Sequence, residues 1–261
     1  MERIAVITGG GQGVGAAAAR QFLHEGFGGV VLVDRNAMAL ARTEDRFADR
    51  KRVVTITADL MDLETPRKVM ALAEKSFGRV DVLLNSAGNT ERCGIDDTTP
   101  EAFDRLFAVN VKAPLFMMQE AGKLMRTQGS GVVINIASML SYGGPPSIGT
   151  YSASKAALVG LSKNAANAWK REGIRVFVIN LGWANSDGEH QLQTGFHKMP
   201  ENWAELIGKR MPFGRLITPE DVAGVCSFLA SPAARMMTGA VIDYEQMPIG
   251  TYDVHPALAP E

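Results

Sequence analysis

Short apolar runs alternate with helix-forming stretches along most of this chain. The runs lie near residues 4–8, 29–33, 53–57, 81–85, 132–136, 174–180 and 238–242. Continuous apolar runs of this length are typical of strands buried on both faces, and strands separated by helices pair in parallel. The alternation therefore predicts an α/β fold, a doubly wound parallel sheet of about seven strands with helices on both faces.

The composition fits one domain and excludes several classes of protein. The 261 residues are 46% hydrophobic and contain no long Pro/Ser linker, so we expect a single domain over residues 1–261. A formal net charge of −1 with scattered basic residues lacks the electrostatic footprint of a nucleic-acid binder. No apolar run is long enough for a membrane span, and the first strand follows Met1 too closely for a signal peptide. We therefore expect a cytoplasmic protein without nucleic-acid or membrane partners.

Metal-ligating residue types are sparse. Cys93 and Cys226 stand in dissimilar contexts without metal-ligand spacing, so we expect neither a disulfide nor a metal-binding pair. His190 and His197, seven residues apart with Glu189 beside the first, come nearest to a metal pattern. A metal there is the minor alternative, and we expect none.

A glycine-rich turn follows the first apolar run. Residues Ile4 to Thr8 lead into Gly9-Gly-Gly-Gln12-Gly13-Val14-Gly15, and an alanine-rich helix former comes next. Glycines allow backbone N–H groups to approach a phosphate, while the start of the following helix presents its positive end to the same anion. Strand, glycine turn and helix together predict a site for a dinucleotide pyrophosphate. A plain turn is the alternative.

An acidic residue ends the second apolar run. Asp34 lies nineteen residues beyond Gly15. A carboxylate at this place can bond both ribose hydroxyls and repels a 2′-phosphate, which favours NAD over NADP. Arg35 weakens this preference, because a basic residue there could hold the 2′-phosphate, but we favour a solvated loop arginine.

Tyr151 and Lys155 are four residues apart in a stretch that predicts a helix, so both side chains should leave the same face. A phenol has a pKa of about 10, and a nearby ammonium favours its charged form. The pair therefore predicts proton transfer to or from an alcohol. An ordinary pair on a solvated helix face is the alternative.

Together these motifs resemble the short-chain dehydrogenase/reductase family, classical type, over roughly residues 2 to 250. The match continues through Asp59-Leu60, Asn85-Ser-Ala87-Gly88, Asn110, Ser138, Asn180-Leu-Gly182 and Ser186. The resemblance implies a Rossmann fold and an NAD(P)-dependent enzyme acting on CH–OH groups. Small departures from the family pattern are Ser86 in place of asparagine and Leu181 in place of proline.

The resemblance also implies the catalytic group Asn110, Ser138, Tyr151 and Lys155. Tyr151 would exchange the hydroxyl proton of the substrate, and Lys155 would keep the phenol acidic and bind the ribose next to nicotinamide. Ser138 would donate a hydrogen bond to the reacting oxygen, and Asn110 would hold a water in a proton relay.

Further residues are implied as cofactor contacts. Asp59 would meet the adenine amino group with Leu60 against the ring, and Ser186 would reach the carboxamide or the phosphates. Two of the catalytic residues, Tyr151 and Lys155, are also implied as cofactor contacts. The full implied set of cofactor-binding residues is Gly9, Gln12, Gly13, Val14, Gly15, Asp34, Arg35, Asp59, Leu60, Asn85, Ala87, Gly88, Tyr151, Lys155, Gly182 and Ser186.

Residues 185–215 depart from the rhythm of strands and helices and are rich in polar groups. We expect this segment to be a substrate lid, with Trp183, Glu189 and His190 near the tyrosine. An indole face and hydrogen-bonding groups favour a sugar or polyol substrate. Lid side chains that only face water are the alternative.

Three functions follow from these observations. The leading hypothesis is interconversion of a secondary alcohol with a ketone or lactone, NAD-dependent and on a sugar or polyol. The alternatives are an NADPH-dependent ketoreductase of the 3-oxoacyl type and a non-catalytic dinucleotide sensor. The resemblance implies a homotetramer, and residues 251–261 look loosely ordered or draped over another subunit.

Overall fold

A computed structural model describes residues 2–250, so residues 251–261 and the expectation for them lie outside the described part. Within it, seven parallel strands form one sheet in the order β3-β2-β1-β4-β5-β6-β7. The strands are β1 (Ile4–Thr8), β2 (Gly29–Asp34), β3 (Val53–Thr57), β4 (Val82–Asn85), β5 (Gly131–Ile136), β6 (Ile174–Leu181) and β7 (Val241–Tyr244). The order reverses between β1 and β4, which confirms the doubly wound Rossmann fold.

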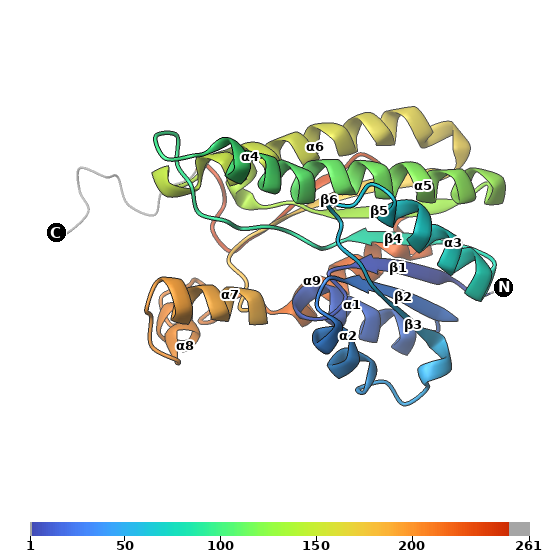
Figure 1. Cartoon of the computed structure of the whole chain (residues 1–261), viewed down its shortest axis with the longest axis horizontal. Coiled ribbons are helices and arrows are strands. Elements are labelled where there is room, and N and C mark those ends of the chain that lie inside the picture. Colours follow the sequence, from blue (N-terminus) through green and yellow to red (C-terminus); the bar gives the residue numbers. More distant parts are fainter. Residues whose placement is uncertain (1, 251–261) are drawn as a thin grey trace.

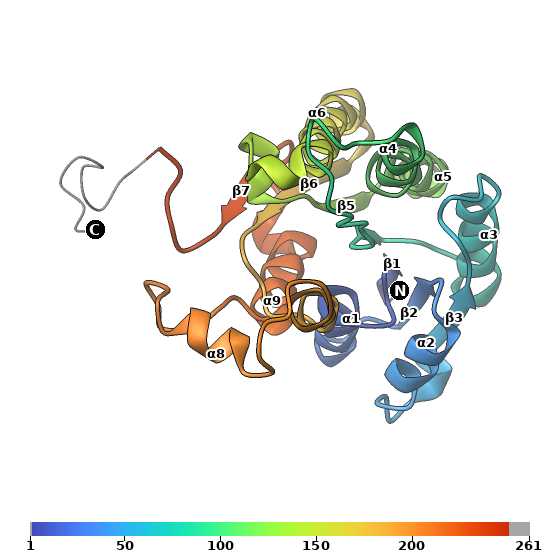
Figure 2. The same cartoon turned by 60° about the vertical axis from the view of Figure 1, so that its left-hand side comes forward.

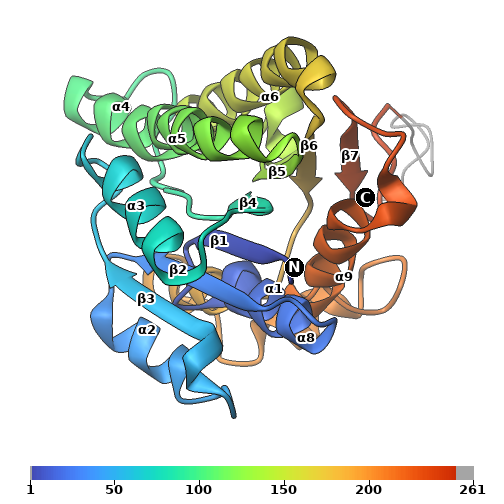
Figure 3. The ribbon, with the colours of Figure 1, turned by 90° about the vertical axis from the view of Figure 1, so that its right-hand side faces the viewer.

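Helices cover both faces of the sheet. They are α1 (Gly13–His24), α2 (Ala37–Glu44), α3 (Thr65–Phe77), α4 (Pro100–Phe107), α5 (Ala113–Gln128), α6 (Gly149–Trp169), α7 (Asp187–Gln191), α8 (Trp203–Gly208) and α9 (Pro219–Ala230). Helices α1, α2 and α9 lie on one face and α3 to α6 on the other (Figures 1 and 3). Helices α7 and α8 stand apart from both layers, beyond the carboxyl ends of the strands (Figure 1), and Figure 2 shows α8 projecting away from the sheet. No helix within residues 2–250 has the length and apolar character needed to cross a membrane.

The core explains why the strands read as continuous apolar runs. In β1, Ala5 and Ile7 pack with Phe22 of α1 in one buried cluster. Val6, between them, faces the opposite side and packs with Met117 of α5 in a second cluster. Successive side chains of a strand point to opposite faces, so a sheet covered on both sides needs apolar residues at every position.

The strand predictions agree with the structure to within a residue or so, except for the last. That strand was predicted at residues 238–242 and is found at Val241–Tyr244. Thr238 and Gly239 already bond to Val176 at the start of β6, but Gly239 has a φ of 73°, outside the strand region. The strand therefore begins after that glycine.

Buried amides join two strands to helix α6. Asn85 at the end of β4 donates to the side-chain oxygen of Asn135 in β5 at 2.8 Å, and Asn135 donates to the hydroxyl of Ser162 in α6 at 2.8 Å. Asn135 and Ser162 are at most 1% exposed. Ser86 stands where the family has a second asparagine, and here the amide pair that links neighbouring strands is Asn85 with Asn135.

Removing the central amide tests how much this network stabilises the fold. Asn135→Ala leaves the Asn85 amide without its acceptor and opens a cavity, so we expect the free energy of unfolding to fall by about 2–4 kcal/mol. Urea denaturation of the cofactor-free protein measures the change.

The matched control is Asn167→Ala on the exposed side of α6, where the amide contacts only Lys170. A surface substitution of this kind should change the free energy of unfolding by less than about 0.5 kcal/mol. Equal losses in the two variants would show that the buried network contributes nothing special.

Candidate active site

The glycine turn joins β1 to α1 with little space to spare. Gly13 has a φ of 54°, and a Cβ at Gly15 would overlap the carbonyl oxygen of Gly9. The Gln12 side chain does not cap α1, which leaves the first N–H groups of the helix available to an anion. The Val14 side chain faces the core, so any contact from it to a cofactor must come through its backbone.

Asp34 lies at the end of β2, directly beside the glycine turn. Its carboxylate accepts hydrogen bonds from Gly11 N at 3.1 Å and Asn36 N at 3.0 Å. These bonds fix the carboxylate where the sequence predicts contact with the ribose. The Arg35 side chain next to it is exposed.

Asp59 and Leu60 follow β3, the edge strand. The Asp59 carboxylate accepts from Met61 N at 2.9 Å, and its carbonyl accepts from the Thr65 hydroxyl at 2.6 Å. Asp59 thus caps the turn before α3, while half-buried Leu60 packs on the core beneath it. The exposed Asp59 side chain stays accessible at the carboxyl edge of the sheet.

The segment after β4 packs on the glycine turn. Thr8 at the end of β1 accepts hydrogen bonds from Ser86 N and Ala87 N, each at 3.2 Å. Gly88 lies next to the predicted catalytic group, because a Cβ there would be 3.6 Å from Lys155 Nζ and 3.7 Å from the Asn110 side-chain oxygen. The ends of β1 and β4 therefore meet next to the predicted catalytic group.

Tyr151 and Lys155 lie near the start of α6 and are 8% and 4% exposed. Lys155 Nζ is 5.7 Å from the centroid of the Tyr151 ring and donates to the carbonyl oxygen of Ile136 at 2.9 Å. Ser138, just past β5, accepts from Leu140 N at 3.2 Å and so begins the short 3-10 turn Met139–Tyr142. The structure brings these three side chains together in a buried environment.

The electrostatics of this group differ from the sequence-based expectation. Burial raises the pKa of Tyr151, while a hydrogen bond from Ser138 and the positive charge of Arg92 lower it, and the charge of Glu189 raises it. Burial also lowers the pKa of Lys155 to about 8. Burial has the largest effect on the pKa of Tyr151, and Arg92 is a cation that lowers it. The role of Lys155 in keeping the phenol acidic stays a prediction.

Sequence reasoning missed Arg92. It lies in the loop between β4 and α4, four residues after Gly88. A charged residue in a loop at the carboxyl edge of a parallel sheet is the signal that could have identified it, because ligands bind at that edge.

Asn110 occupies the π-helical turn Ala108–Lys112 between α4 and α5. It is fully buried, donates to the Asn89 carbonyl at 2.8 Å and to the Ser154 hydroxyl at 3.0 Å, and accepts from Asn89 N at 2.8 Å. The amide has the partners that a buried helix-kink amide needs, and it lies beside Lys155, where a water relay is predicted.

The segment 185–215 is more regular than the sequence suggests. It contains α7, the π-helical turn Leu192–Phe196 and α8. Ser186 caps α7 through its hydroxyl, which accepts from Glu189 N at 3.3 Å. Ser186 also faces the glycine turn, since a Cβ at Gly13 would be 3.6 Å from its Cβ. Because the segment is rich in polar residues, these short helices were not predicted from the sequence.

The polar side chains of this segment mainly bind one another. Glu189 accepts from the Trp183 indole at 2.9 Å and from Gln193 at 2.8 Å, and His190 accepts from the Trp203 indole at 3.1 Å. The two indoles stack with centroids 5.9 Å apart, Trp203 fully buried and Trp183 38% exposed. Trp183 is therefore the aromatic surface that remains available at the site.

Both ends of the segment are fixed to the two residues that follow β7. At its start, Glu245 accepts from Trp183 N at 3.3 Å and fills the space beside Gly182, where a Cβ would overlap the carboxylate. At its end, Gln246 accepts from Phe213 N at 2.9 Å and donates to the Arg215 carbonyl at 2.8 Å. Leu181, in place of the family proline, belongs to β6 and pairs in register with Tyr244.

A groove of about 610 Å³ lies beside the glycine turn, within the size range of ligand pockets. Its walls include residues 11–13 and 185–187, and the guanidinium groups of Arg20, Arg42 and Arg46. Backbone N–H groups, a serine and positive charge suit the phosphates of a dinucleotide. Asp187 and Glu220 also line the groove, and Asp34, Lys155 and Tyr151 do not. The uncapped start of α1 and the closely packed glycine turn beside the groove are the features that fit the pyrophosphate of a nicotinamide dinucleotide.

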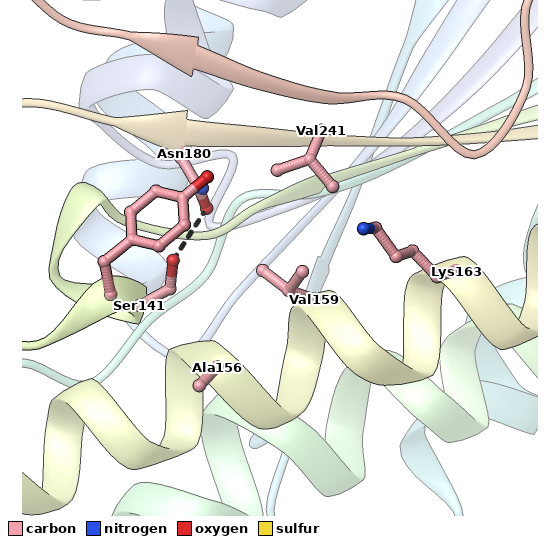
Figure 4. Close-up of a pocket in the computed structure, with 7 residues that line it drawn as sticks. Ser141, Ala156, Val159, Lys163, Asn180 and Val241 are labelled. Carbon is pink, nitrogen blue, oxygen red and sulfur yellow. Dashed lines mark hydrogen bonds between the residues drawn. The ribbon is translucent and has the colours of Figure 1, made fainter. Parts of the chain in front are cut away.

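A smaller cavity of about 150 Å³ lies between α6 and strands β6 and β7 (Figure 4). Asn180 borders it and accepts from the Ser141 hydroxyl at 3.2 Å. Tyr151 and Lys155 do not line it, so it is separate from the predicted catalytic group.

Cys93 and Cys226 are both free and buried, and burial raises the pKa of Cys226 to about 12. Across residues 2–250, no cluster of three or more His, Cys, Asp or Glu side chains is arranged to hold a metal ion. His190 instead pairs with Glu201 at 3.1 Å.

Known proteins are similar to this chain in sequence and in architecture. The family model described as Enoyl-(Acyl carrier protein) reductase matches residues 9–245. Galactitol 2-dehydrogenase of Agrobacterium fabrum is 32% identical over 237 residues, 88% of this chain and 90% of that protein. Sorbitol dehydrogenase of Cereibacter sphaeroides is 33% identical over 239 residues, with coverages of 89% and 91%.

The solved structure of a 3-ketoacyl-(acyl-carrier-protein) reductase from Brucella melitensis, complexed with NADH, is 30% identical, with a TM-score of 0.81. The match covers 93% of this chain and 96% of that one. A full-length family match and relatives above 30% identity agree with the Rossmann sheet and the glycine turn. The chain belongs to the short-chain dehydrogenase/reductase family and is an oxidoreductase that acts on alcohols.

Proposed function

We propose that this protein interconverts a secondary alcohol and a ketone or lactone, with NAD as cofactor and a sugar or polyol as substrate. The observation that supports this proposal most directly is that Tyr151, Lys155 and Ser138 are buried together beside the glycine turn. Similarity to galactitol and sorbitol dehydrogenases supports the substrate class. We also propose, on the family resemblance alone, that the protein is a cytoplasmic homotetramer.

The residues at the glycine turn would hold the cofactor. The N-terminus of α1 would bind the pyrophosphate, and the Asp34 carboxylate would accept hydrogen bonds from the adenosine ribose. Lys155 would bind the other ribose, with its ammonium oriented by the Ile136 carbonyl. A bound nicotinamide would supply the hydride acceptor.

The side chains would handle the proton. In the direction of oxidation, the phenolate of Tyr151 takes the hydroxyl proton as the alcohol becomes a carbonyl, and Ser138 holds the same oxygen by a hydrogen bond. Burial disfavours the phenolate, while the charge of Arg92 and the Ser138 hydrogen bond offset part of that cost. Asn110, held by Asn89 and Ser154, would position the water that carries the proton onward.

A second candidate is reduction of an oxoacyl substrate with NADPH. Similarity to the solved 3-ketoacyl reductase supports it, and exposed Arg35 could meet a 2′-phosphate. The carboxylate of Asp34 opposes it, since it would repel that phosphate.

Tyr151→Phe tests the proposed chemistry. Without a proton acceptor, kcat/KM for a polyol such as galactitol should fall by about 10²–10⁴-fold. NAD binding, measured by calorimetry, should stay within a factor of about three, since the phenyl ring remains. Undiminished turnover by this variant would rule out the mechanism.

Asp34→Ala tests cofactor preference. Loss of charge-assisted hydrogen bonds to the ribose, worth about 1.5–3 kcal/mol, should lower the ratio of kcat/KM for NAD to that for NADP by about 10–100-fold. Steady-state kinetics with both cofactors gives the ratio. Asp45→Ala, which removes an exposed partner of Arg50 just past the end of α2, is the control and should leave the ratio unchanged. A wild-type preference for NADP would instead favour the second candidate.

Lys155 should make stability depend on pH. Burial lowers its folded-state pKa to about 8, below the ordinary lysine value of 10.5, so the unfolded chain binds the extra proton between these values. The free energy of unfolding of the cofactor-free wild type, relative to Lys155→Met, should therefore rise as pH increases from about 8 to 10.5. Urea denaturation at several pH values measures it, and a flat or falling difference would mean that Lys155 is not buried as described.

A further inference from the structure

The loop between β4 and α4 borders the predicted catalytic group, and Arg92 lies at its centre. On one side of Arg92, the backbone of Asn89 exchanges hydrogen bonds with the side chain of Asn110. On the other side, Cys93 is buried in a small apolar cluster that contains Tyr151. The loop therefore contacts the predicted catalytic group on both sides of Arg92, through Asn110 on one side and Tyr151 on the other.

The guanidinium of Arg92 has donors that no residue between 2 and 250 accepts from. Arg92 is half-buried, and its Nε is a buried donor without an acceptor. No hydrogen bond or ion pair joins its side chain to any residue between 2 and 250. The neighbouring Glu91 is not available to it, because Arg105 binds the Glu91 carboxylate.

A buried donor without an acceptor is costly, about 1–3 kcal/mol and more for a charged group. Such a group in a folded protein needs an explanation, and a missing ligand is one. The position of Arg92 in the loop beside Tyr151 and Asn110 places that ligand at the catalytic group. The positive charge also acts on Tyr151, where it lowers the phenol pKa.

We infer that Arg92 binds a carboxylate on the substrate, so that the preferred substrate is a polyhydroxy acid rather than a neutral polyol. The planar guanidinium matches a carboxylate through two parallel N–H···O bonds. Glu189, the acidic group that also acts on Tyr151, is already bound by Trp183 and Gln193. Arg92 thus has hydrogen bonds still to give to a ligand at the site. The inference rests on the proposed function and narrows its substrate class.

Matched substrate pairs provide the test. D-gluconate and D-glucitol, and D-galactonate and galactitol, differ at one end by a carboxylate in place of a hydroxymethyl group. We expect the wild-type kcat/KM to be higher for the acid of at least one pair. Arg92→Gln should lower the acid-to-polyol ratio of kcat/KM by about 10–100-fold. Each variant is measured on its pH plateau, since removing Arg92 also raises the pKa of Tyr151.

Arg50→Gln is the matched control, because it removes an exposed guanidinium that pairs with Asp45 and leaves the Glu91–Arg105 pair beside Arg92 intact. Its acid-to-polyol ratio should equal that of the wild type. Calorimetry in a Tyr151→Phe background, which suppresses turnover, adds a binding readout: D-gluconate or D-galactonate should bind the Tyr151→Phe complex with NAD⁺ and bind the Tyr151→Phe/Arg92→Gln complex at least about tenfold more weakly.

The outcomes separate the inference from the proposed function. Oxidation of polyols with no preference for the acids, or an equal loss of both activities in Arg92→Gln, would overturn the carboxylate inference and leave the function standing. Failure of the wild type to oxidise any of the four compounds would count against the proposed substrate class and the inference together.

Discussion

Burial of both faces of a parallel sheet is the constraint on which the rest of the structure depends. Because every strand needs apolar residues throughout, polar side chains are confined to the strand ends and the loops that follow them. Parallel pairing brings all carboxyl ends to one edge. Thr8, Asp34 and Ser138 come from strands far apart in the sequence, yet they belong to one site for this reason.

Within that site, burial and charge act against each other. Tyr151 and Lys155 are nearly inaccessible, which disfavours the charged form of each, so both pKa shifts reduce the population of the ion pair. Two groups partly offset this for the phenol, namely a hydrogen bond from Ser138 and the charge of Arg92. The arrangement ties acid–base behaviour to solvent access: a ligand that changes the burial of Tyr151 also changes its proton affinity.

The sheet and the spatial grouping of the site could be predicted from the sequence because both depend on local patterns. Apolar runs give strands, glycine spacing gives the turn, and a separation of four gives a shared helix face for Tyr151 and Lys155. The start of β7 was wrong because the left-handed turn at Gly239 is not visible as a break in an apolar run.

Properties that depend on three-dimensional distance were not predictable. The direction of the Tyr151 pKa shift follows from how deeply the ring is buried, and the effect of Arg92 follows from the path of a loop. The helices of segment 185–215 were hidden because their polar side chains, such as Glu189 and His190, are satisfied by partners within the same segment rather than by an apolar face.

Attachment of both ends of segment 185–215 to Glu245 and Gln246 has a mechanical consequence. Because Glu245 and Gln246 are neighbours, one short stretch after β7 holds both ends of the segment, and the stacked indoles join its middle. A change in the position of that stretch would therefore reach both ends of the segment together.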